Sequence, residues 1–220
     1  MRCLMLSGWA QDPQTLRVLL PKAIEAHALD YMALDEAALW HIAREGMPAP
    51  DLLLGWSLGG QLAVRLVVEG ILRPRLLVLL GTPCHFQGDA GYRRAVRQFT
   101  QTPEVFLRGF AALCDAGGKA ATPYPLYRPA LQHVPALDDW LRVLEQTDIS
   151  GLDFSAFPPT LLLHGREDAV IPVAESERLA TLIPGSRLHC LPGCGHALHH
   201  HATAHVCQLI EEAIRTYATA

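Results

Sequence analysis

The sequence predicts an α/β fold in which helices flank a mainly parallel sheet of about six strands. Apolar runs of strand length alternate along the chain with amphipathic stretches of helix length. Two of the runs, LLVLLG and TLLLHG, are apolar nearly throughout, which is typical of strands that helices cover on both faces. A repeated strand-then-helix order builds a parallel sheet with right-handed crossovers.

Six runs are expected to form the strands. They cover residues 2–7, 26–32, 51–55, 75–81, 160–164 and 186–191. The helices that connect or follow these strands are expected near residues 14–21, 35–45, 58–70, 173–182 and 197–217.

Residues 83–157 interrupt the alternation. They contain no convincing buried strand but show helical patterns near 89–100, 103–113 and 136–147. No repeat or low-complexity linker divides the chain. We therefore expect one domain, residues 1–220, with a helical lid inserted at 83–157.

The composition narrows the class of protein. Half of the 220 residues are hydrophobic and 18% are charged, which predicts a packed globule. A net charge of −4 argues against nucleic acid as the main partner, because phosphate binding needs a basic surface. The longest charge-free apolar run, 52–64, is shorter than the roughly 20 residues that cross a bilayer, so no membrane span is expected.

The cysteines and the first residues suggest a cytoplasmic protein. Six cysteines are scattered along the chain, mostly beside apolar residues, and reduced thiols fit them better than a disulfide framework. Residues 2–7 have strand length and no cleavage site follows them, so we interpret them as the first strand rather than as a signal peptide.

A candidate nucleophile lies between a buried strand and a helix. Gly55, Trp56, Ser57, Leu58 and Gly59 form the pattern G-x-S-x-G, which in this context predicts a nucleophile elbow. The tight turn exposes Ser57 above the sheet, and glycines are needed where a Cβ would clash. The alternative is a turn without a chemical role.

A serine nucleophile needs a histidine base and a carboxylate that orients it. Asp168 follows the expected strand 160–164, and His196 follows the last strand, so both fall at carboxyl ends of strands. We therefore predict Ser57, Asp168 and His196 as the catalytic residues. Glu167 is the competing acid, with a solvated loop charge as its other interpretation.

The segment HALHHHATAH holds five histidines, with i,i+4 spacing between His196 and His200 and between His201 and His205. No neighbouring cysteine or paired carboxylate completes a ligand set, so we expect surface or packing roles and no metal. His164, inside a strand, is expected to be structural. The chemistry requires no metal or organic cofactor.

An acyl-transfer site also needs donors for the oxyanion. We predict the backbone N–H of Leu58, the residue after the nucleophile, and that of Trp9 in the loop after the first strand. The Trp9 indole would line the acyl pocket. Its other interpretation is a packing aromatic without a catalytic role.

Five segments carry a family resemblance: SGWA (7–10), GWSLGG (55–60), TPCHF (82–86), LEQTDISGLDFSAFPPTLLLHGREDAVIP (144–172) and GCGHALHHH (193–201). On these segments the chain resembles the α/β-hydrolases, and more narrowly the pimeloyl-acyl-carrier-protein methyl ester esterases of biotin synthesis. The resemblance implies a serine carboxylesterase that hydrolyses an acyl ester. The chain starts almost at the oxyanion loop, so it resembles a shortened form of the family.

The inserted segment offers candidates for substrate contact. A pimeloyl chain needs an apolar channel, which Phe110 and its neighbours can line, and each of them can instead hold the lid to the core. The full set is Phe86, Phe99, Phe106, Phe110 and Leu113.

The same segment is locally basic on an otherwise acidic protein. The resemblance implies docking of an acidic acyl carrier protein on this patch, and a solvated helix face is the alternative. The candidate docking residues are Arg93, Arg94, Arg97 and Arg108.

The residues leave other functions open. An acyl thioesterase or a general short-chain carboxylesterase would use the same catalytic residues. The fold also serves as a ligand-binding receptor or interaction module. Acyl length, leaving alcohol and oligomeric state are not determined by the sequence.

Overall fold

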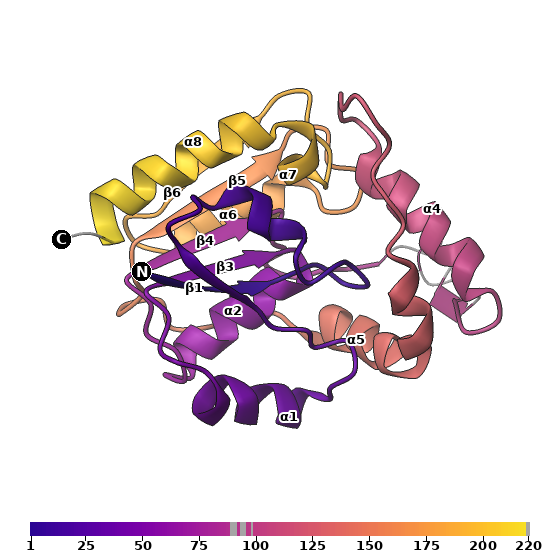
Figure 1. The fold of residues 1–220 in the computed structure, drawn as a ribbon, viewed down its shortest axis with the longest axis horizontal. Helices are drawn as coiled ribbons and strands as arrows, with labels where there is room; N and C mark the ends of the chain where they lie inside the picture. The colour runs from indigo at the N-terminus through magenta and orange to yellow at the C-terminus, as the bar shows by residue number, and fades with distance from the viewer. Residues whose placement is uncertain (89–91, 93–95, 98, 219–220) are drawn as a thin grey trace.

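The structure is a computed structural model that describes residues 1–88, 92, 96–97 and 99–218. Its centre is a six-stranded parallel sheet in the order β2-β1-β3-β4-β5-β6 (Figure 1), which confirms the predicted fold class. The strands are β1 (Arg2–Leu6), β2 (Glu25–Ala28), β3 (Leu52–Trp56), β4 (Leu76–Leu80), β5 (Thr160–Gly165) and β6 (Arg187–Leu191).

The helices are mostly those that the periodicity predicts. They are α1 (Glu36–His41), α2 (Leu58–Val68), α4 (Pro103–Asp115), α5 (Val134–Gln146), α6 (Val173–Leu182), α7 (Leu198–His201) and α8 (Thr203–Ala213). Short 3-10 helices cover Thr15–Leu19 and Arg128–His133, and π-helical turns cover Ile42–Gly46 and Ile214–Ala218.

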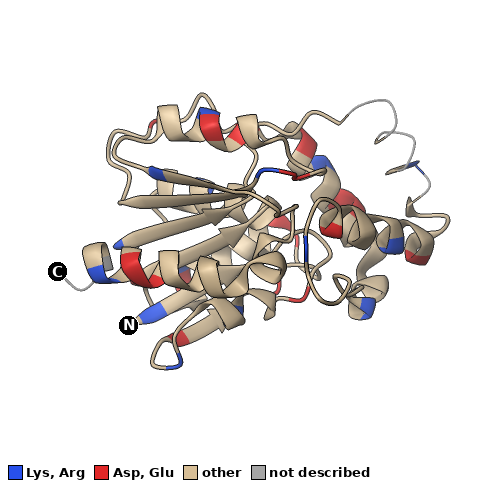
Figure 2. Cartoon of the chain, turned by 90° about the horizontal axis from the view of Figure 1, so that it is seen from above, with Lys and Arg blue, Asp and Glu red and all other residues tan. Residues whose placement is uncertain are grey.

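Alternate residues of the central strands pack into two separate cores. On one face, Leu53 and Leu77 pack with the apolar sides of α1, α2 and α6. On the other face, Leu52 and Val78 pack with Thr15–Leu19 and α8. Figure 2 shows the charged residues mainly on helices and loops, and β3, β4 and β5 contain none. These three strands are buried on both faces, which explains why their runs are apolar nearly throughout.

Three elements differ from the prediction. The helix expected at 14–21 is a short 3-10 helix, and β2 ends at Ala28 rather than at residue 32. The helix expected at 197–217 is divided into α7 and α8 at Ala202, whose φ and ψ of −135° and 41° are not helical. The helix expected at 89–100 lies largely outside the described residues.

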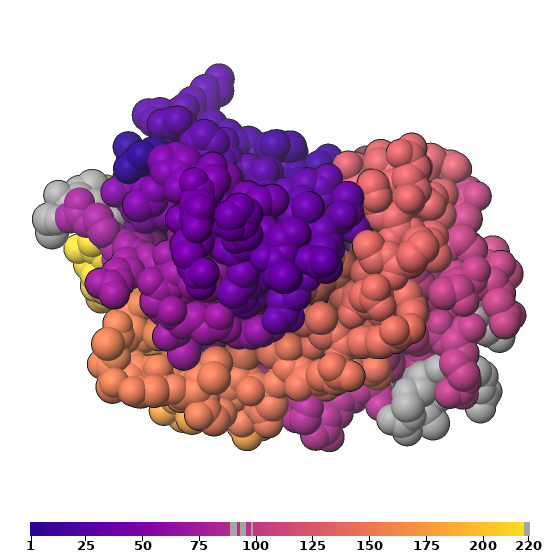
Figure 3. Space-filling view, turned by 90° about the horizontal axis from the view of Figure 1, so that it is seen from below, coloured from indigo at the N-terminus to yellow at the C-terminus, as the bar shows by residue number. Residues whose placement is uncertain are grey.

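The segment between β4 and β5 contains α4 and α5, and it lies at the carboxyl ends of the strands (Figure 1). Trp140 anchors α5, because its fully buried indole Nε1 donates to the carbonyls of Tyr31 and Leu34, each at 3.0 Å. Figure 3 accordingly shows this segment meeting the N-terminal part of the chain in one continuous surface. Within the described residues, no helix is long and apolar enough to cross a membrane.

Candidate active site

Ser57 occupies a strained turn between β3 and α2. Its φ of 55° lies in the left-handed region, which a residue with a side chain rarely adopts. A Cβ on Gly59 would lie 2.2 Å from the carbonyl oxygen of Leu6, and one on Gly55 would lie 2.7 Å from the Cα of Gly60. Only glycine fits at these two positions, so the turn brings α2 against β1 and presents Ser57 at the end of the sheet.

Asp168 and His196 form a buried pair. Asp168 Oδ2 lies 2.7 Å from His196 Nδ1, and neither side chain is exposed. Asp168 Oδ1 accepts hydrogen bonds of 2.8 Å from the amides of Val170 and Ile171. Burial alone would raise the pKa of Asp168, but the charge of His196 and hydrogen bonds from His164 and His196 hold that pKa well below its usual range. An ionised Asp168 fixes the proton of neutral His196 on Nδ1 and leaves Nε2 free as a base.

His196 is held beside the serine turn by a residue of that turn. The indole Nε1 of Trp56, the residue before Ser57, donates to the carbonyl of His196 at 3.1 Å. Gly81, with φ of 48°, allows the imidazole to approach, since a Cβ there would lie 3.2 Å from His196 Nδ1. Nε2 of His196 is buried and has no hydrogen-bond partner in the described part of the chain. Nδ1 of the buried His199 has no partner in the described part of the chain either, so His196 is distinguished by its pairing with the buried carboxylate of Asp168.

The backbone amides predicted to bind the oxyanion are those of Trp9 and Leu58. Neither the N–H of Trp9 nor the N–H of Leu58 donates a hydrogen bond to any described residue. Leu58 is the first residue of α2, so the positive end of the helix dipole adds to its donor. Ala10, the residue after Trp9, has φ of 55° and shapes the loop.

A cavity of about 830 Å³ opens onto Ser57 and Trp9. The Trp9 indole donates to the Leu137 carbonyl at 2.8 Å and contacts Phe110 edge to face, with the ring centroids 5.3 Å apart. Four of the five apolar candidates of the inserted segment line this cavity: Phe86, Phe106, Phe110 and Leu113. The fifth, Phe99, is fully buried and packs against Trp9 instead.

One wall of the cavity is polar, and sequence reasoning missed it. His85, Glu175 and Arg178 line this wall, and the His85 amide donates to Glu175 Oε2 at 2.8 Å. Glu175 and Arg178 lie in the first turns of α6, directly after the loop that carries Asp168. No short-range motif marks them, because the β4–α4 connection meets α6 only in the folded chain.

Glu167 is an exposed loop residue, as its other interpretation expects, and its carboxylate also has hydrogen-bond partners. Its Oε2 accepts hydrogen bonds from the amides of Gly193 and Cys194, at 2.8 and 3.2 Å. Glu167 therefore binds the loop that precedes His196, and it makes no hydrogen bond to His196 itself. The geometry brings Asp168, and not its neighbour, to the histidine.

The histidines of α7 connect neighbouring segments. His199 is buried with its ring centroid 4.3 Å from that of Trp56, and burial lowers its pKa to about 3. His201 Nδ1 accepts from the Gly195 amide and Nε2 lies beside Asp115 Oδ1, both at 3.1 Å. His200 Nε2 donates to the Thr122 carbonyl at 2.8 Å, and His205 is exposed. Among the described residues, no group of three or more potential ligands could hold a metal ion.

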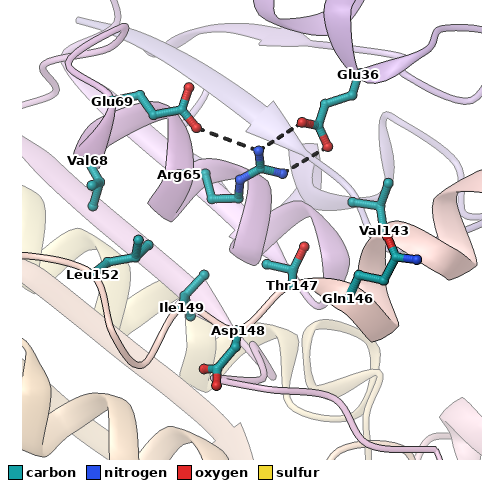
Figure 4. Close-up of a pocket in the computed structure, with 10 residues that line it drawn as sticks. All are labelled: Glu36, Arg65, Val68, Glu69, Val143, Gln146, Thr147, Asp148, Ile149 and Leu152. Atoms are coloured by element: carbon teal, nitrogen blue, oxygen red, sulfur yellow. Dashed lines mark hydrogen bonds and ion pairs between the residues drawn. The ribbon is translucent and has the colours of Figure 1, made fainter.

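A second, smaller cavity of about 340 Å³ lies between α1, α2 and the end of α5 (Figure 4). Arg65 crosses it and donates to both oxygens of Glu36, at 2.9 and 2.8 Å, while Glu69 Oε1 lies 3.6 Å from the guanidinium. No residue of the Ser57 site lines it.

The candidate docking arginines are only partly described. Arg93 and Arg94 lie outside the described residues, and Arg97 is exposed. Arg108 pairs with Glu104 at 2.7 Å, and Arg128 approaches the same carboxylate oxygen at 3.2 Å. The exposed end of α4 therefore carries two guanidinium groups around one carboxylate.

Comparison with known proteins identifies the class. Residues 4–206 match the alpha/beta hydrolase family, and the chain belongs to this family. An esterase from Exiguobacterium antarcticum has the same fold, with a TM-score of 0.83 at 18% identity over 98% of this chain and 92% of that one.

Two curated proteins are similar along most of their length. The chain is 30% identical to the pimeloyl-[acyl-carrier protein] methyl ester esterase of Aromatoleum aromaticum, over 96% of this chain and 97% of that protein. It is 29% identical to the protein of that name from Nitrosomonas europaea, over 88% and 87%. The protein is a carboxylic ester hydrolase, which sets aside the receptor and interaction-module alternatives.

Proposed function

We propose that Ser57, His196 and Asp168 are the catalytic residues of this hydrolase. His196 Nε2 takes the proton of Ser57 as the serine oxygen attacks the ester carbonyl, and Asp168 stabilises the imidazolium that forms. The N–H groups of Leu58 and Trp9 hold the oxyanion. His196 then protonates the departing alcohol, and water releases the acid from the acyl-enzyme by the same two proton transfers.

We propose the methyl ester of pimeloyl-acyl-carrier protein as the substrate. The observation that carries this proposal is the buried Asp168–His196 pair, which Trp56 holds next to the turn of Ser57, together with the cavity of about 830 Å³ and mostly apolar walls that Ser57 lines. The cavity suits an extended acyl chain, and the two similar esterases are named for this ester. On this proposal the protein acts in the cytoplasm, and residues 83–157 form its lid, with Phe110 against the acyl chain.

The test is hydrolysis of methyl pimeloyl-acyl-carrier protein, with the products identified by mass spectrometry. The proposed activity removes only the methyl group and leaves the pimeloyl thioester on the carrier. A thioesterase would instead release free carrier protein. A general carboxylesterase would cleave dimethyl pimelate as efficiently as the carrier-linked ester. The gene should also restore growth without biotin to a strain that lacks its demethylating esterase.

A further inference from the structure

His164 is a fully buried residue of β5 that the proposed mechanism does not use. Its Nε2 lies 3.0 Å from the carbonyl oxygen of Ile171 and 3.3 Å from Oδ2 of Asp168. Its Nδ1 lies 2.6 Å from the hydroxyl of Ser176, on α6. The imidazole of His164 therefore lies against the same carboxylate oxygen of Asp168 that His196 contacts.

The partners of each nitrogen determine where the proton of His164 lies. Nε2 faces two acceptors, a carbonyl and a carboxylate, so Nε2 must carry the hydrogen. The Ser176 hydroxyl can then donate to Nδ1, and both nitrogens of a neutral ring are satisfied. This arrangement needs no charge on His164, which agrees with its complete burial.

We propose that His164 is a positioning residue for Asp168, the acid of the proposed catalytic residues. Four donors then surround Asp168: the amides of Val170 and Ile171 on Oδ1, His196 on Oδ2, and the Nε2–H of His164, which Oδ2 shares with the carbonyl of Ile171. Four donors fix the plane of a carboxylate, and this plane sets the direction of the Nδ1–H bond of His196. His164 thus acts through Asp168 and touches no substrate.

The same contact affects the basicity of His196. A donor on Oδ2 draws negative charge away from the bond to His196, so Asp168 stabilises the imidazolium less than it would without His164. The other titratable groups around the pair are Cys114 of α4 and His199 of α7. Burial raises the pKa of the Cys114 thiol well above its usual value and lowers that of His199 to about 3, so both stay neutral at the working pH.

Three variants separate positioning from packing. His164→Phe keeps a ring but removes the donor, whereas His164→Gln can place an amide N–H near the position of Nε2. Ser176→Ala removes the hydrogen bond at Nδ1 of His164 and leaves the contacts of Nε2 with Ile171 and Asp168 in place. It is the matched control for the attachment of α6 to β5. Each is assayed on a small soluble ester for the pH dependence of kcat/KM and for Tm.

The proposal predicts that His164→Phe lowers kcat/KM about 10- to 100-fold, the effect of losing one hydrogen bond to a charged group. The limb of the profile that reports protonation of His196 moves to higher pH. His164→Gln restores most of both losses. Ser176→Ala lowers Tm but leaves the limb unmoved. An unmoved limb in His164→Phe, with a loss of Tm like that of Ser176→Ala, would overturn the proposal and leave His164 a packing residue.

An NMR titration tests the positioning role of His164 independently of the proposed role of Ser57. The pKa of His196 is measured directly in the Ser57→Ala background, with and without His164→Gln or His164→Phe, and this needs no turnover. A higher pKa of His196 in His164→Phe than in His164→Gln supports positioning even if Ser57 proves not to be the nucleophile. Equal values in the two variants overturn it. If His164→Phe does not fold, Ser57→Ala with His164→Leu replaces it in the same comparison.

Discussion

The small cavity and the Ser57 site differ in how their polar side chains are satisfied. In the small cavity, Arg65 is satisfied by Glu36 and Glu69, and its guanidinium also lies 4.7 Å from the centre of the Trp40 ring. Next to the turn that carries Ser57, which lines the large cavity, the buried Nε2 of His196 has no partner among the described residues. Polar groups that satisfy one another hold helices together, whereas a buried group without a partner is available for a substrate.

Backbone strain also distinguishes the large cavity from the small one. Ser57 and Ala10 are the only residues other than glycine with positive φ in the described part of the chain. Ser57 lines the large cavity and Ala10 follows Trp9, which also lines it. Strain of this kind costs about 1–3 kcal/mol per residue and persists where the surrounding structure enforces it. The following changes test whether chemistry is confined to the large cavity.

Removing the nucleophile should give the largest effect. Ser57→Ala should lower kcat by a factor of about 10⁴ to 10⁶ with little change in Tm, because the oxyanion donors and the cavity remain. A serine-reactive phosphonate should label only the wild type. Labelling that persists in Ser57→Ala would assign the nucleophile to another residue.

Neutralising the acid should come next. In Asp168→Asn the amide donates toward His196 Nδ1, which favours the wrong tautomer, and kcat should fall about 10⁴-fold. Glu167→Gln is the matched control, since it makes the same change one residue away. We expect only a small loss there, through the loop that Glu167 binds. Equal losses in the two variants would contradict the choice of Asp168.

The Asp168–His196 pair should also contribute to stability in a pH-dependent way. The pKa of Asp168 is lower in the folded protein than the usual value near 4. Its contribution is therefore present above the unfolded pKa and is lost as the pH falls through the folded pKa. The difference in unfolding free energy between wild type and Asp168→Asn, measured by urea titration, should shrink below about pH 4. A difference that stays constant from pH 7 to strongly acid solution would contradict this.

The small cavity should respond in stability alone. Arg65→Met removes the link between α1 and α2 and should cost about 1 kcal/mol of unfolding free energy, because the ion pairs are partly exposed. The value of kcat/KM should not change. Arg44→Met is the control, as Arg44 is exposed and makes no ion pair in the described structure. A loss of activity without a loss of stability would show that the small cavity is coupled to catalysis.

Sequence patterns predict the central strands well, because β3, β4 and β5 are buried on both faces and are almost wholly apolar. They fail where distant packing decides the local structure. Residues 197–217 have one helical periodicity, yet the chain bends at Ala202, where His199 turns inward to pack on Trp56. Phe99 has the spacing of a channel residue but packs under Trp9.

The candidate site shows the same division. The elbow around Ser57 can be recognised from adjacent residues, because its glycines are required by contacts within one turn and the next strand. The hydrogen-bond partners of Glu167, Glu175 and His164 cannot be recognised in this way, because each partner lies on another segment of the fold. His164 illustrates this best: its position in an apolar strand indicates a structural residue, and only the fold places its Nε2 beside Asp168.

The smallest effect is expected on the surface of the inserted segment and concerns the carrier. Reversing Arg93, Arg94 and Arg97 to glutamate should raise KM several-fold for a carrier-linked ester and flatten its salt dependence, because an acidic partner is then attracted less. Hydrolysis of a small soluble ester should stay unchanged, since it needs no contact with the carrier.

The matched control reverses Arg44, Arg73 and Arg75, which changes the net charge equally. All three are exposed, and Arg73 and Arg75 immediately precede β4, at the end of the sheet opposite the Ser57 site. If carrier docking involves the inserted segment, this control should leave KM for the carrier-linked ester within about twofold of wild type, because exposed charges more than about 10 Å away are screened at physiological salt. Equal increases in KM for the two triple variants would show that overall net charge, and not the inserted segment, causes the effect. Equal losses on carrier-linked and small esters in the first variant would indicate a misfolded segment, and no loss on either would remove carrier docking from this face of the molecule.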